Sequence, residues 1–136
     1  MNYQIKSIII TVFVSFLITG KTSHMPKLQE EITMISAHEL NEMLADKDFT
    51  LINVHIPYAG EIPGTDLFIP FHSVRKNLDK LPDKNAKIVL YCMSDPMSTM
   101  VAKKLAKRGF SNLYNLEGGM KGWKKAGYEL VMRDDK

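Results

Sequence analysis

Short apolar runs alternate along most of the chain with segments in which apolar residues recur at helical spacing. The apolar runs predict strands at residues 32–35, 49–54, 67–70, 88–91 and 112–115. The segments between and after them predict helices at about 36–46, 73–81, 98–108 and 117–126. Strands that alternate with helices through right-handed crossovers predict an α/β domain: an open, mainly parallel sheet with helices on both faces.

Two local signals sharpen this pattern. Ser36 and Glu39 have the Ser-x-x-Glu spacing of a capping box, so the first helix is expected to begin at Ser36. From residue 55 to 65 the chain reads HIPYAGEIPGT, where two prolines and two glycines exclude regular structure. A loop of this length in a compact domain is often functional.

The first 23 residues have a different pattern. An apolar stretch over residues 7–20 follows Lys6 and ends at Lys21, and it is shorter than the roughly 20 residues of a membrane span. We interpret residues 1–23 as an export signal, 24–31 as a polar linker and 32–136 as the folded domain. No Ala-x-Ala-like cleavage site follows, so an uncleaved N-terminal anchor, a membrane tether through residues 7–20, remains an alternative. We therefore expect a periplasmic or extracellular protein, anchored to the membrane if the signal is kept.

The charge balance argues against a nucleic-acid partner. The chain has 18 basic and 15 acidic residues, and removal of residues 1–23 takes away Lys6 and Lys21 and no acid, which leaves 16 basic residues. A nearly neutral domain lacks the basic surface that nucleic-acid binding requires. The single cysteine excludes an internal disulfide, so the core has to hold the fold.

That cysteine, Cys92, follows the strand 88–91 and precedes a predicted helix. With the helix expected to begin near Ser98, residues 92–97 form a six-residue loop whose amides can surround the sulfur. Such a nest, with a helix N-terminus behind it, favours a thiolate and an anion above it. The alternative from position alone is a buried structural thiol, which is a common fate of a free cysteine.

Three segments resemble the rhodanese family of single-domain sulfurtransferases, and the likeness extends from about Met34 to Leu130. The most specific is residues 115–127, NLEGGMKGWKKAG, which is similar to the family's closing "GG, then W, then AG" pattern. The others are Ile62-Pro63-Gly64 and the pair Tyr91-Cys92 at the head of the loop. Phosphatases of related fold have an arginine six residues after the cysteine, where this chain has Ser98, so phosphatase activity is not expected.

The resemblance implies sulfur transfer through a Cys92 persulfide. A small sulfur-containing anion such as thiosulfate would donate the sulfur, and a thiol or another nucleophile would accept it. No metal and no organic cofactor is implied. The active-site loop would then comprise Cys92 and the residues that follow it, Met93, Ser94, Asp95, Pro96, Met97 and Ser98.

The chain also departs from the family pattern. The loop of typical members reads much like C-R-S-G-R-x-S, whereas the arginine and glycine positions are here Met93, Asp95 and Pro96. Asp95 is expected to oppose a thiolate and an anionic donor, and Pro96 removes one amide from the nest. The usual Asp-x-Arg after the second strand is Asn53-Val-His55, which leaves only neutral hydrogen bonds unless the histidine is protonated.

His55, with a loop-facing hydrogen bond as its alternative role, and Glu61 are the candidate substrate-side residues. The sequence thus supports two functions. The first is a sulfurtransferase that uses thiosulfate or, because the loop lacks arginine, another sulfane sulfur donor or acceptor. The second is a non-catalytic module of the same fold that recognises a sulfur species, a metal or a partner protein.

Overall fold

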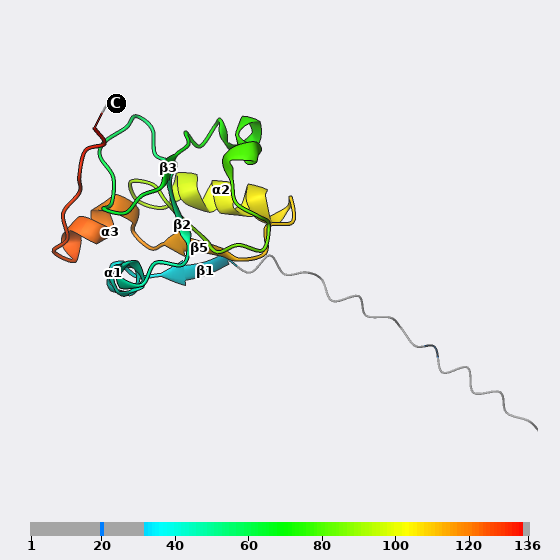
Figure 1. Cartoon of the computed structure of the whole chain (residues 1–136), viewed down its shortest axis with the longest axis horizontal. Helices are drawn as coiled ribbons and strands as arrows, with labels where there is room; N and C mark the ends of the chain where they lie inside the picture. Colours follow the sequence, from blue (N-terminus) through cyan, green and yellow to red (C-terminus); the bar gives the residue numbers. More distant parts are fainter. Residues whose placement is uncertain (1–19, 21–31, 135–136) are drawn as a thin grey trace, which may run out of the picture.

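The computed structural model of the chain describes Gly20 and residues 32–134. Its strands are β1 (Ile32–Ile35), β2 (Thr50–Asn53), β3 (Leu67–Phe68), β4 (Ile88–Tyr91) and β5 (Leu113–Leu116). The α-helices are α1 (Ala37–Ala45), α2 (Pro96–Ala106) and α3 (Gly119–Lys125), and two 3₁₀ helices are η1 (Val74–Lys76) and η2 (Leu78–Lys80). Strands and helices alternate along the chain as the sequence predicts, except that β3 follows β2 with only a loop between them (Figure 1).

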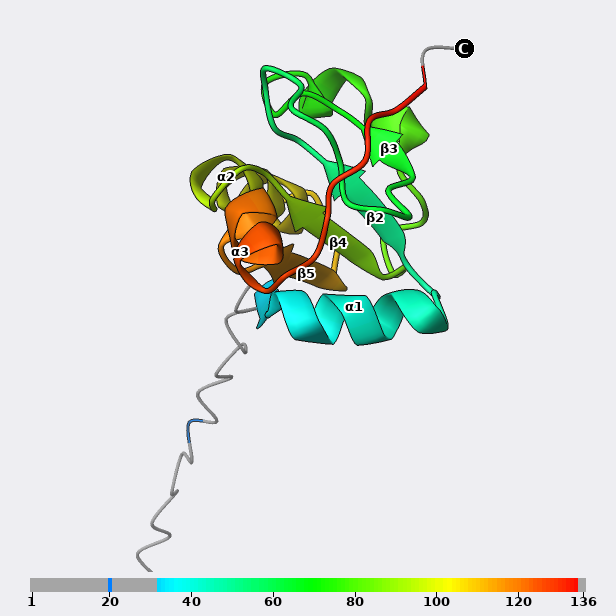
Figure 2. The ribbon, with the colours of Figure 1, turned by 90° about the vertical axis from the view of Figure 1, so that its left-hand side faces the viewer.

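The five strands form one sheet in the order β1-β5-β4-β2-β3, and every neighbouring pair is parallel. Helix α2 covers one face, while α1 and α3 lie together against the other (Figures 1 and 2). The predicted α/β class with helices on both faces is therefore confirmed. Parallel strands end at the same edge of a sheet, so the loops after β2 and β4 lie side by side at the carboxyl edge.

Each face of the sheet has its own core, because residues along a strand point alternately to opposite faces. All four residues of β4 are buried, as expected of a strand covered on both sides. Ile88 and Leu90 join the cluster under α2, whereas Val89 and Tyr91 join the cluster under α1 and α3. The next residue, Cys92, again belongs to the α2 side.

The capping box at the start of α1 forms as predicted. The Glu39 amide donates to Ser36 Oγ over 3.2 Å, and the Ser36 amide donates to Glu39 Oε2 over 2.7 Å. The hydrogen bond from the Ser36 amide favours the charged carboxylate, so the pKa of Glu39 is lowered. This cap fixes the direction in which the chain leaves β1.

Strand β3 ends two residues earlier and α3 begins two residues later than predicted, and two further elements differ. Helix α2 begins at Pro96 and not at Ser98, so only residues 92–95 separate it from β4. Proline lacks an amide hydrogen and favours the first helical position, which explains the earlier start. The segment predicted as one helix over 73–81 forms η1 and η2. Asn77 Nδ2 donates to the Ser73 carbonyl over 2.9 Å, and this side-chain bond competes with the α-helical bond to that carbonyl.

The predicted export signal or anchor and the linker lie outside the described residues, apart from Gly20. Within the described residues, no helix combines the length and the apolar character that a membrane crossing needs.

Candidate functional site

Cys92 follows β4 in the middle of the sheet and is 1% exposed. Its side chain belongs to the apolar cluster under α2, which contains Val54 and Val101 as buried members and Phe71 and Met97 as partly buried ones. The chain reaches this position because β4 is buried throughout and α2 starts four residues later. The sulfur therefore lies where the sheet, the loop and the helix N-terminus meet.

A buried hydroxyl is bonded to this sulfur. Ser98, which is fully buried in the first turn of α2, has its Oγ 3.3 Å from Cys92 Sγ. The same Oγ lies 3.1 Å from the Asp95 carbonyl, to which it donates. A hydroxyl has one proton, so in this arrangement the Cys92 thiol donates to Ser98. A thiolate can only accept, so Ser98 would then rotate to donate to the sulfur and release the Asp95 carbonyl.

The N-terminal residues of α3 bind the backbone of the loop that follows β4. The Met120 amide donates to the Cys92 carbonyl over 2.8 Å, and the Lys121 amide donates to the Met93 carbonyl over 3.0 Å. Gly119 has φ +54°, and a Cβ there would lie 2.3 Å from the Cys92 carbonyl oxygen. Only glycine permits this close approach of two backbones.

The only charged side chain of the loop, Asp95, also contacts α3. It stands at the N-cap of α2 but makes no side-chain bond to that helix. Its Oδ1 accepts instead from the Gly118 amide over 3.0 Å. The carboxylate thus fastens the loop to α3 and leaves the first amides of α2 uncapped.

Several backbone amides of the loop and of the first turn of α2 have no hydrogen-bond acceptor within the described residues. Within residues 32–134, no hydrogen bond is made by the backbone N–H groups of Met93, Ser94, Met97 and Ser98. The loop carbonyls of Cys92 and Met93 are bound to α3. This division leaves the amides to a bound anion or to water, which is the arrangement of an anion-binding nest.

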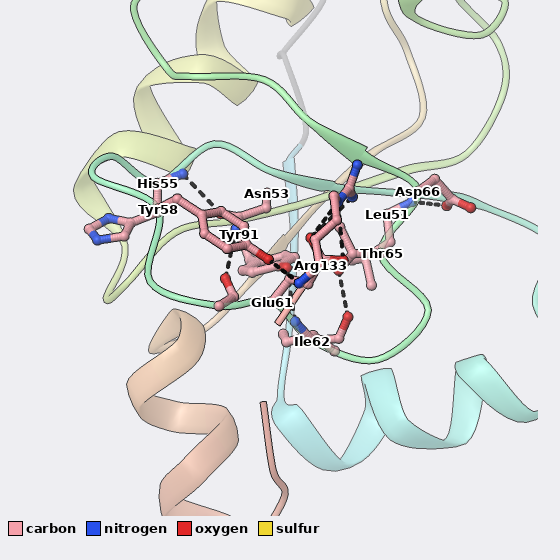
Figure 3. A network of polar contacts seen from close by, with 11 residues as sticks. Leu51, Asn53, His55, Tyr58, Glu61, Ile62, Thr65, Asp66, Tyr91 and Arg133 are labelled. Atoms are coloured by element: carbon pink, nitrogen blue, oxygen red, sulfur yellow. Dashed lines mark hydrogen bonds and ion pairs between the residues drawn. The ribbon is translucent and has the colours of Figure 1, made fainter. Parts of the chain in front are cut away.

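Asn53 braces the neighbouring loop after β2, as expected, by neutral hydrogen bonds. Its Nδ2 donates to the Gly60 carbonyl over 3.1 Å, and its Oδ1 accepts from the His55 amide over 3.0 Å (Figure 3). The His55 ring points away from this network, and its buried Nδ1 has no partner among the described residues. Burial disfavours the charged imidazolium, so the pKa of His55 is lowered.

Glu61 interacts with the C-terminal segment through both its backbone and its side chain. Its backbone forms an antiparallel bridge with Val131, and its carboxylate lies 3.0 Å from Arg133 Nη2. The Arg133 amide also donates to the Tyr58 hydroxyl over 2.8 Å, so the final segment runs along the loop after β2 (Figures 2 and 3). Within the described part of the chain, no hydrogen bond or ion pair joins Glu61 to Cys92. Its substrate-side role stays a prediction, as does that of His55.

Tyr91, the last residue of β4, forms hydrogen bonds with the loop after β2. Its fully buried hydroxyl accepts from the Ile62 amide over 3.0 Å and lies 2.7 Å from Thr65 Oγ1, which itself donates to the Ile62 carbonyl (Figure 3). The hydroxyl thus donates to Thr65 and is satisfied on both sides. Burial raises the pKa of Tyr91 well above its ordinary range, so it remains a neutral structural group.

The contacts of Gly118 and Gly119 with the loop could not be derived from local sequence. The two glycines lie more than twenty residues after Cys92, and only the fold brings them together. Their signal in the sequence is the double glycine of the closing segment, which marks a close backbone approach without naming the partner.

The five parallel strands with helices on both faces define an open-sheet α/β protein. Its cysteine lies in the loop between the middle strand β4 and the covering helix α2. The chain matches the rhodanese-like domain family over residues 36–126 and belongs to it. The family predicted from the closing segment is thereby confirmed.

Its relatives include proteins named as sulfurtransferases. A sulfurtransferase of Allochromatium vinosum is 29% identical over 104 residues, which cover 74% of this chain and 95% of that protein. The thiosulfate sulfurtransferase GlpE of Actinobacillus pleuropneumoniae serotype 5b is 26% identical over 105 residues and covers 76% and 96%. A solved rhodanese-like domain protein from Staphylococcus aureus is 27% identical, with a TM-score of 0.64, and the match covers 76% of this chain and 100% of that one.

Proposed function

We propose that this protein is a sulfurtransferase that carries sulfane sulfur on Cys92. The observation that carries the proposal is the setting of Cys92: it directly follows a central strand, its Sγ contacts the buried Ser98 hydroxyl, and the loop that it begins has amides without acceptors among the described residues. The sulfurtransferases among its relatives support the same activity.

The chemistry has two balanced steps. The Cys92 thiolate attacks the sulfane sulfur of a donor, a new S–S bond forms, and the donor's S–S bond breaks so that its leaving group takes the electron pair. An acceptor thiolate then attacks the outer sulfur of the persulfide, and Cys92 leaves as the thiolate. The loop amides and the rotated Ser98 hydroxyl would bind the negative charge in each state.

A second function is supported by two observations. Cys92 is 1% exposed, and the loop's only charged side chain is acidic. A binding module of the same fold, without turnover, would show both features. It would recognise a sulfur species, a metal or a partner protein through the same loop.

Intact mass spectrometry separates the two functions. The purified, reduced protein is incubated with thiosulfate and separately with a polysulfide, beside the Cys92→Ser variant. We expect the mass to rise by one sulfur atom with at least one donor, and Cys92→Ser to show no gain. A folded protein that gains no sulfur from either donor would rule out the sulfurtransferase and leave the module.

We also propose export from the cytoplasm, on the basis of the apolar stretch at residues 7–20. N-terminal sequencing of the protein from its native host tests this proposal. A new N-terminus near residue 24 supports a cleaved signal, and an intact one in the membrane fraction supports an anchor. An intact N-terminus in the cytoplasmic fraction contradicts export.

A further inference from the structure

The charge around Cys92 limits the sulfur donors that this site can use, provided that the proposed sulfurtransferase function holds. Residues 92–99 read CMSDPMST and contain one charged side chain, Asp95. Its carboxylate is fixed beside the loop by the Gly118 amide at 3.0 Å. Among the described residues, Lys121, the first lysine after the glycine pair, makes a hydrogen bond to the loop through its backbone amide and none through its charged side chain.

The surroundings of the sulfur are apolar. Cys92 shares its cluster with Val54, Val74 and Val101, while Phe71 and Met97 are partly buried against it. Phe71 is placed there because its amide donates to the Val54 carbonyl over 3.0 Å, beside the end of β4. Aromatic and thioether groups interact well with polarisable sulfur, but they do not replace the water around a charged group.

Thiosulfate is poorly matched to this site. It carries two negative charges, and a buried charge needs an opposite charge or several hydrogen bonds. Backbone amides are the only donors that the loop offers besides serine hydroxyls, and Pro96 has none. The carboxylate of Asp95 adds repulsion that a dianion feels twice as strongly as a singly charged donor.

We propose that the donor is an organic hydropersulfide, R–S–SH, whose only ionisable group is its outer sulfur and which reacts in its neutral form, and that Asp95 and Pro96 determine this specificity. In the reaction, the Cys92 thiolate attacks the outer sulfur of R–S–SH. The bond between Cys92 and that sulfur forms, the R–S bond to it breaks, and the R–S⁻ thiolate leaves with the electron pair. The hydrogen stays on the transferred sulfur, so no oxidant or reductant is required.

The test compares the rates at which Cys92 gains one sulfur from two donors, thiosulfate and the hydropersulfide of 2-mercaptoethanol, by quenched-flow mass spectrometry. Each variant is characterised by the ratio of its thiosulfate rate to its hydropersulfide rate. Pro96→Arg restores an amide and adds a positive charge, and Pro96→Gln restores the amide alone. Pro96 is exposed at the first position of α2, so both side chains fit there. Asp95→Asn removes the negative charge and keeps an oxygen that can accept from Gly118.

We expect the wild-type ratio to be below about 0.1 at low salt and to rise with ionic strength as the Asp95 charge is screened. Pro96→Arg is expected to raise the ratio about tenfold over Pro96→Gln, and Asp95→Asn to raise it as well. A wild-type ratio of one or more, or equal ratios for Pro96→Arg and Pro96→Gln, would overturn the proposed specificity while the sulfurtransferase function stands. Loading by neither donor would instead overturn the function on which this inference rests.

Discussion

Substitution of Gly119 by alanine tests whether close contact between α3 and the loop positions Cys92. A Cβ at this position would lie 2.3 Å from the Cys92 carbonyl oxygen, 2.9 Å from the Met93 carbonyl carbon and 2.9 Å from the Ser94 amide nitrogen. All three atoms belong to the backbone, so no side chain can rotate away. The loop has to retreat by about 0.7 Å before the shortest contact reaches 3.0 Å, the least that Cβ atoms tolerate.

Two costs follow for Gly119→Ala. Alanine at φ +54° is strained by about 1–2 kcal/mol, and the displaced loop adds about 1–3 kcal/mol of overpacking. The displacement also stretches the two hydrogen bonds from α3 to the loop carbonyls of Cys92 and Met93. Because a misplacement of about 1 Å can cost about a hundredfold in rate, sulfur loading is expected to fall by one to two orders of magnitude, about 10- to 100-fold.

Gly127→Ala is the matched control. Gly127 has φ +93°, and nothing lies within 4 Å of its added Cβ, so this variant carries only the backbone strain. Urea denaturation gives the loss of stability, and mass spectrometry with the better donor gives the loading rate. We expect Gly127→Ala to be destabilised by about 1–2 kcal/mol, with far less effect on loading. If Gly119→Ala loads sulfur as quickly as Gly127→Ala, the contact does not position Cys92.

Three further changes test the neighbouring loop. Tyr91→Phe should lose about 1–3 kcal/mol in urea denaturation, because the buried Ile62 amide loses its acceptor; an unchanged midpoint would contradict that hydrogen bond. Glu61→Gln should cost less than about 1 kcal/mol, because Arg133 is 41% exposed. In thermal melts, the double variant Glu61→Gln/Arg133→Gln should lose little more stability than either single variant. Losses of stability that add fully would show that the two side chains are not coupled. His55 has its pKa lowered by burial, so the unfolded chain binds a proton more readily and stability should fall as the pH drops below about 6.5. His55→Gln should flatten that decline in urea midpoints compared between pH 7.5 and 5.5, and parallel curves for the two proteins would refute the assignment.

The parts of the fold that depend on local sequence could be predicted, and those that depend on distant contacts could not. Strand β4 and the capping box of α1 are encoded within a few residues each, and both form as expected. The sequence pattern predicts the start of α2 two residues late, because the helical spacing of apolar residues begins only after Pro96. Proline at the first helical position was the signal that could have corrected it.

The residues of the candidate site show the same difference between features that follow from local sequence and features that depend on distant contacts. The position of Cys92 at the end of a strand follows from the apolar run before it, and the neutral bracing by Asn53 follows from its side-chain chemistry. The direction of the Asp95 carboxylate was not predictable, since an acidic residue directly before a helix ordinarily caps that helix. Here it binds the Gly118 amide, which comes from an element 23 residues later.

The two halves of a sulfane donor make different demands on this loop. The transferred sulfur needs hydrogen-bond donors close to Cys92 Sγ, and the buried Ser98 hydroxyl together with the free loop amides can meet that need. The leaving group needs compensation for its own charge farther out, where the chain has Asp95 and Pro96. A sulfite leaving group carries two negative charges past that position, whereas an alkyl thiolate carries one, so the repulsion from Asp95 is smaller for the thiolate. Under the proposed function, the hydrogen-bond donors of the loop would hold the persulfide, and the charge of the leaving group would decide how fast it forms.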